Sequence, residues 1–73
     1  MTYYMTKRAP TEGSYPKFTN NKVISVTDFG GSLQVLQRTD GGLQMTTAYG
    51  MVKYEKPISN WDADAYDMVP IIS

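Results

Sequence analysis

The sequence predicts a small α+β or mainly β domain, with a short antiparallel sheet of three to four strands in a meander and one C-terminal helix. Turn-forming residues recur near positions 20, 30, 41 and 50, and β-branched or aliphatic residues fill the intervals between them. A spacing of about ten residues between turns is typical of a β-meander or a small barrel. Because the chain has only 73 residues, we expect one domain with a thin core.

The N-terminal segment, residues 1–17, is predicted to be an irregular, flexible arm. Pro10, Gly13 and Pro16 are spaced so that neither a helix nor a long strand can run through this segment. Residues 18–73 are then expected to form the single β-rich domain.

The first two strands are predicted over residues 22–28 and 32–39. β-Branched side chains dominate the first segment, which favours a strand. In the second, apolar residues alternate, but Leu33 and Leu36 also lie at helical spacing, so strand and helix both remain open. The strand is favoured, because an isolated helix of about eight residues is marginal.

Two similar glycine pairs, Gly30-Gly31 and Gly41-Gly42, each follow an aspartate closely. Aspartate can accept a hydrogen bond from its own backbone at the start of a turn, and glycine supplies positive φ values. We therefore predict that the chain reverses direction at both pairs. Further strands are expected over residues 43–47 and 51–55, separated by a turn at 48–50.

A short helix is predicted over about residues 60–68. Ser59 provides an N-cap, and Asp62 and Asp64 lie near the positive end of the helix dipole. The apolar residues of this segment form one stripe at helical spacing, which is expected to lie on the sheet. These residues are Trp61, Ala65, Met68 and Val69.

The residue inventory argues against catalysis. The chain has no His and no Cys, so common general bases and thiolate metal sites are missing. The clustered carboxylates Asp62, Asp64 and Asp67 are better explained as solubilising residues at a helix start than as a metal site. We predict no catalytic residue, no cofactor and no metal.

The charge distribution favours a binding protein. Acidic and basic residues balance at seven each, but residues 1–22 carry a net charge of +3 and residues 55–73 a net charge of −3. No apolar stretch is long enough for a membrane span, and no signal peptide is evident. We expect a cytoplasmic monomer without a small-molecule substrate.

Aromatic, methionine and charged residues at the two ends are the candidate partner-binding residues, since such residues supply interface anchors. They are Tyr3, Tyr4, Met5, Lys7, Arg8, Trp61, Asp62, Asp64 and Tyr66. Interleaved aromatic and basic residues also suit a single-stranded nucleic-acid-binding module, and a structural virion protein is a third possibility.

Over its whole length, from Met1-Thr2-Tyr3-Tyr4 to the segment Asn60-Trp61-Asp62, the chain resembles very small phage proteins that regulate bacterial RNA polymerase. This resemblance implies a non-enzymatic protein that binds the β and β′ subunits or the σ factor of the host enzyme. It implies inhibition of transcription initiation and, in some cases, antitermination. No residue role follows from it, because these regulators share a role rather than a sequence pattern.

Overall fold

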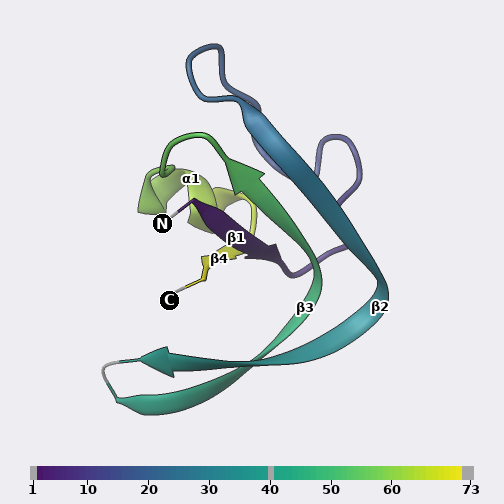
Figure 1. The fold of residues 1–73 in the computed structure, drawn as a ribbon, viewed down its shortest axis with the longest axis vertical. Coiled ribbons are helices and arrows are strands. Elements are labelled where there is room, and N and C mark those ends of the chain that lie inside the picture. The colour runs from purple at the N-terminus through teal and green to yellow at the C-terminus, as the bar shows by residue number, and fades with distance from the viewer. Residues whose placement is uncertain (1, 40, 72–73) are drawn as a thin grey trace.

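The computed structural model describes residues 2–39 and 41–71, and within them an antiparallel sheet of four strands is accompanied by one short helix (Figure 1). The elements are β1 (Tyr3–Thr6), β2 (Val23–Thr39), β3 (Gly42–Tyr54), α1 (Asn60–Ala65) and β4 (Met68–Pro70). The predicted fold class is confirmed. The strand order is β2-β3-β1-β4, so β1 lies between β3 and β4 and only β2 and β3 follow the order of a meander.

Part of the segment predicted as an irregular arm is a strand inside the sheet. Tyr4 of β1 pairs with Val52 of β3 on one side and with Pro70 of β4 on the other. Tyr4, Met5 and Thr6 are buried. The prolines and glycine that predicted irregular structure all lie beyond β1, in residues 7–22, which contain no helix or strand.

The predicted reversal at Gly30-Gly31 is wrong, because β2 continues through both residues. The local chemistry is as expected: the backbone N–H of Gly30 donates to Asp28 Oδ1 at 2.8 Å, and φ is +74° at Gly30 and +157° at Gly31. The result is an irregularity in the pairing, since Asp28 faces Gly50 and Leu33 faces Ala48. Extra residues in one strand bend it, and the β2–β3 hairpin turns sharply near its middle (Figure 1).

Residues 32–39 are a strand, as favoured, and not a helix. The predicted break at 48–50 is wrong, because β3 runs unbroken to Tyr54. Gly50 does not form a turn, and its lack of a side chain allows neighbouring atoms to pack closely against it. A Cβ at Gly50 would collide with the Pro10 ring and lie 2.6 Å from the carbonyl oxygen of Thr27.

The second glycine pair does close a hairpin, because Thr39 pairs with Gly42. Asp40, part of that predicted turn, lies outside the described residues. Gly42 has a φ of +117°, a value that favours glycine.

The helix begins as predicted but ends early. Ser59 is the N-cap, and its Oγ accepts a hydrogen bond from the backbone N–H of Asp62 at 3.1 Å. The helix ends at Ala65 and not near residue 68, because Asp67 adopts a left-handed φ of +53° and the chain enters β4. The predicted apolar stripe is therefore wrong: Ala63 is the buried helical residue, and Trp61 is 85% exposed.

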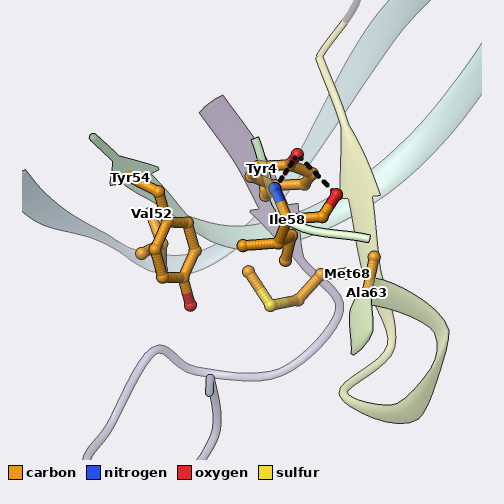
Figure 2. Packing of buried hydrophobic residues seen from close by; sticks show 6 residues of the cluster. All are labelled: Tyr4, Val52, Tyr54, Ile58, Ala63 and Met68. Carbon is orange, nitrogen blue, oxygen red and sulfur yellow. Dashed lines mark hydrogen bonds between the residues drawn. The ribbon is translucent and has the colours of Figure 1, made fainter. Parts of the chain in front are cut away.

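The core lies on one face of the sheet, which we call the covered face. Along β3 the even-numbered residues from Ala48 to Tyr54 are buried, and the odd-numbered ones are less so. The buried apolar side chains come from β1, β3, β4, α1 and the connection before α1 (Figure 2). They are Tyr4, Val52, Tyr54, Ile58, Ala63 and Met68.

Two tyrosine hydroxyls and one asparagine tie the connecting segments to this core. The Tyr4 hydroxyl accepts from the N–H of Ile58 at 2.9 Å (Figure 2), and the Tyr54 hydroxyl donates to the carbonyl of Pro16 at 2.6 Å. Burial raises the pKa of Tyr54 above its ordinary value. The Asn21 side chain makes two hydrogen bonds to the backbone of Lys56. These contacts fix the position from which α1 starts.

Candidate protein-binding face

The other side of the sheet, which we call the open face, is formed by the alternate residues of the same strands. Tyr3 pairs with Lys53, and Lys53 Nζ lies 5.0 Å from the centre of the Tyr3 ring, so both side chains lie on this side. Since side chains alternate along a strand, the odd-numbered residues of β3 share this face. They are Leu43, Met45, Thr47, Tyr49, Met51 and Lys53.

The open face extends beyond the core along the distal hairpin, which we define as residues 33–39 and 42–48. Of the other helices and strands in the described part of the chain, β2 packs against β3 alone. In Figure 1, this half of the hairpin turns at the bend and runs below β1 and β4 in the view. The pairing of β3 with β1 ends at Gly50, so the distal hairpin extends beyond the part of the sheet that β1 continues.

Three aliphatic side chains form an exposed cluster on the distal hairpin, which we call the hairpin patch. Leu36 pairs with Met45, and Leu43 is two residues from Met45 along β3. The exposed fractions are 57% for Leu36, 59% for Met45 and 67% for Leu43. A contiguous exposed apolar cluster on a small domain is typical of an interaction site.

A hollow of about 420 Å³ lies beside the hairpin patch. Its lining combines one cation with polar and apolar side chains: Lys7, Gln44, Met45, Thr46, Thr47 and Tyr49. The Lys7 ammonium group makes no ion pair or hydrogen bond to any described side chain. The hollow thus offers an uncompensated positive charge next to a methionine and a tyrosine.

Cationic side chains are spread along the open face. Lys53 and Lys7 lie at its β1–β3 part, and Arg38, which pairs with Leu43, lies on the distal hairpin. Among the described residues that we assign to the open face, none is acidic. This face is therefore apolar and positively charged.

A second exposed surface lies on α1, where Trp61, Asp64 and Ala65 border an open hollow of about 350 Å³. Asp62 is engaged locally, since its carboxylate accepts from the Ser59 hydroxyl at 3.0 Å. Asp67 pairs with Arg8 at 3.4 Å, with both side chains largely exposed. Asp64 has no such partner among the described residues.

The predicted partner-binding residues fall into different environments. Tyr3 and Lys7 lie on the open face, whereas Trp61, Asp62 and Asp64 lie on α1. The remaining four are less accessible or engaged within the fold. Tyr4 and Met5 are buried, Tyr66 packs against the core, and Arg8 pairs with Asp67.

Sequence reasoning missed the hairpin patch. Leu36 and Leu43 are not among the predicted binding residues, and Met45 is predicted only as a side chain that faces either the core or a partner. One continuous strand over residues 42–54 places Leu43, Met45, Tyr49 and Lys53 on a single face by alternation. That alternation was the available signal.

The described residues contain no group of three or more acidic, histidine or cysteine residues placed to hold a metal ion. No helix formed by these residues is long and apolar enough to cross a membrane.

The fold defines a small, mainly β domain with one covered sheet face and an opposite, cationic face that is exposed at Tyr3 and along the distal hairpin but buries Met5, which pairs with Met51. Residues 1–73 match a family model described as defence against restriction A C-terminal. The chain therefore belongs to this phage-associated family. Comparison with curated proteins and with solved structures gave no significant match.

The family corrects one sequence-based interpretation. The resemblance to phage regulators of RNA polymerase is wrong, because the matching family covers the whole chain and is not a known regulator of that enzyme. The predictions of a phage-related protein and of a small β domain are confirmed.

Proposed function

We propose that this chain is a protein-binding module that serves phage defence against restriction, and that the open face of its distal hairpin is the docking surface. The family description supports the role in defence. The observation that carries the docking surface is the exposure of Leu36, Leu43 and Met45, on the part of the hairpin that extends beyond the pairing of β3 with β1. Restriction of incoming DNA takes place inside the bacterial cell, so the proposal places the chain in the host cytoplasm.

The energetic argument concerns the three side chains of the hairpin patch. Complete burial of an aliphatic side chain of this size contributes about 1.5–3 kcal/mol. Within the free chain, this contribution is largely unused, because each of the three is more than half exposed. A partner that covers the patch gains this burial free energy on binding, and the cost of association is subtracted from it.

The chemistry of the open face favours a partner segment that is both apolar and acidic. Lys7, Arg38 and Lys53 provide positive charge around the apolar patch, and complementary charge steers association and sets orientation. Aliphatic side chains at the patch favour protein over single-stranded nucleic acid, because bases stack on aromatic rings.

A phage that encodes this chain with the double substitution Leu36→Thr and Met45→Thr tests the proposal. Threonine keeps the β-branched preference for strands but removes apolar surface from the patch. We expect the ratio of plaques on a restricting host to plaques on a non-restricting host to fall at least tenfold. The unfolding midpoint in urea, measured on the purified chain, is expected to stay unchanged.

Leu33→Thr is the matched control. Leu33 lies on the same strand and is 50% exposed, but it pairs with Ala48 and so belongs to the covered side. We expect this variant to plate like the parent phage. Equal protection by the double variant and the parent would remove the hairpin patch from the function.

A further inference from the structure

We propose that the open face binds a second copy of this chain, with Trp61 of one copy seated in the hollow beside Lys7, Met45 and Tyr49 of the next. This inference rests on the proposed function, because it names the partner of the same face. The sequence alone led us to expect a monomer. The surface that α1 presents argues for self-association instead.

Trp61 is an exposed aromatic residue that can act as an interface anchor. It is the only tryptophan of the chain, and 85% of its surface is exposed on a helix whose start is capped by Ser59. A tryptophan buries about 150–250 Å² when it is covered and is among the commonest interface anchors. Because its backbone is already ordered in α1, seating this side chain requires little additional ordering of the chain.

The hollow lies along β3 beside the hairpin patch, is open to solvent, and is lined by residues of both sheet faces together with Lys7. Its volume of about 420 Å³ lies in the range of sites that accept a bulky group. Met45 supplies a sulfur atom, which packs favourably against aromatic rings. Lys7 supplies a cation, which is attracted to the face of an indole.

The charges beside the two surfaces are complementary. Asp64 borders the hollow next to Trp61, and Lys7 lines the hollow on the open face. Within one chain, neither side chain has an ion-pair partner among the described residues. Seating Trp61 brings the carboxylate of one copy toward the ammonium group of the other, so each charge gains the partner that it lacks.

The two surfaces come from different parts of the chain, so the contact is heterologous. One surface is α1, and the other is formed by β3 and the residue after β1. A heterologous contact extends into a ring or an open chain of copies. Self-association is therefore expected to grow with concentration and not to stop at a symmetric dimer.

A mixing experiment with two complementary variants tests this arrangement. Trp61→Ala removes the inserted group but keeps the hollow, whereas Met45→Thr alters the hollow but keeps Trp61. By light scattering coupled to size exclusion, we expect the wild-type chain to form species larger than a dimer and each variant alone to be monomeric. An equimolar mixture is expected to form a two-chain species and nothing larger, because only one productive contact remains.

A charge exchange provides a second test that does not disturb packing. Lys7→Glu and Asp64→Lys each place like charges at the contact, and each is expected to weaken self-association at least tenfold. The chain that carries both substitutions restores opposite charges and is expected to regain most of the wild-type affinity. Both residues are exposed, so the fold should tolerate these changes.

Two results would overturn the proposal. One is a wild-type chain that stays monomeric at concentrations up to about 1 mM. A dissociation constant of about 1 mM corresponds to a binding free energy of only about 4 kcal/mol. The other is a dimer that Trp61→Ala leaves intact. If the chain is monomeric while the hairpin-patch variant still loses protection, the open face binds a different protein and the proposed function stands. If the chain assembles through Trp61 but the hairpin-patch variant protects as well as the parent, the self-association is correct and the proposed function is wrong.

Discussion

The two halves of the β2–β3 hairpin are made from the same pair of strands but have different surroundings. In the proximal half, residues 23–28 and 50–54, the covered face meets residues 7–22 and the core around Tyr54. In the distal half, residues 33–39 and 42–48, the strands pair with each other, and the pairing of β3 with β1 ends before this half, at Gly50. One half therefore stabilises the fold, and the other is free to bind.

The largest expected effect comes from the proximal half. Tyr54→Ala removes a fully buried ring that contacts the rings of Tyr4 and Phe18, with centroids 5.8 and 6.0 Å away. Loss of a buried aromatic side chain costs about 3–5 kcal/mol, which approaches the whole stability of a small domain. We expect the far-ultraviolet circular dichroism of this variant to show an unfolded chain at 25 °C. A cooperative unfolding transition close to the wild-type midpoint would contradict this view of the core.

Gly50→Ala is expected to have the next largest effect. The added methyl group meets the Pro10 ring and the carbonyl oxygen of Thr27, and overpacking of this kind costs about 1–3 kcal/mol. The free energy of unfolding from urea titration measures the loss. Combining Gly50→Ala with Pro10→Ala serves as the control, because removal of the ring leaves more room for the methyl group and should return part of the stability.

The Tyr54 hydroxyl gives a pH-dependent contribution. Burial raises the pKa of Tyr54 in the folded chain above the unfolded value of about 10. The folded state then holds this proton more tightly, so its stability is complete below pH 10 and is lost as the pH rises above that value. Urea titrations between pH 8 and 11 should show a steeper fall for the wild type than for Tyr54→Phe. Parallel curves would show that the hydroxyl ionises as easily in the folded chain as in the unfolded one.

The smallest effect on stability is expected in the distal half. Leu36→Thr with Met45→Thr changes two side chains that are more than half exposed, and surface substitutions usually change stability by less than about 0.5 kcal/mol each. Urea unfolding should give a midpoint close to that of the wild type. A loss above about 2 kcal/mol would place the hairpin patch in the folding core and not on a binding surface.

Local signals in the sequence predicted the fold class and several details. The Ser59 cap depends on groups three residues apart, and the strand at residues 23–28 depends on its own β-branched side chains, so both could be predicted. The bend at Gly30-Gly31 could not be predicted. An aspartate followed by glycines favours a chain reversal and a β-bulge equally well. The difference depends on β3 continuing alongside through Gly50, where the distant Pro10 packs closely.

The candidate site was predicted only in part for the same reason. Residue types alone pointed to Tyr3, Lys7, Trp61 and Asp64, which lie on the two exposed surfaces. They also pointed to Tyr4 and Met5, which are buried within the sheet between β3 and β4. Trp61 is exposed because α1 packs on the core through Ala63, and the apolar spacing did not reveal which face of the helix would be buried.

Native-state hydrogen exchange on the dilute chain tests the division of the hairpin most directly. Amides that pair in the proximal half and in β1 are expected to exchange only through global unfolding. Paired amides in the distal half, around positions 36 and 45, are expected to exchange through local opening at a distinctly lower free energy. Equal protection along the whole hairpin would contradict the account, because it would make the distal half part of the same cooperative core.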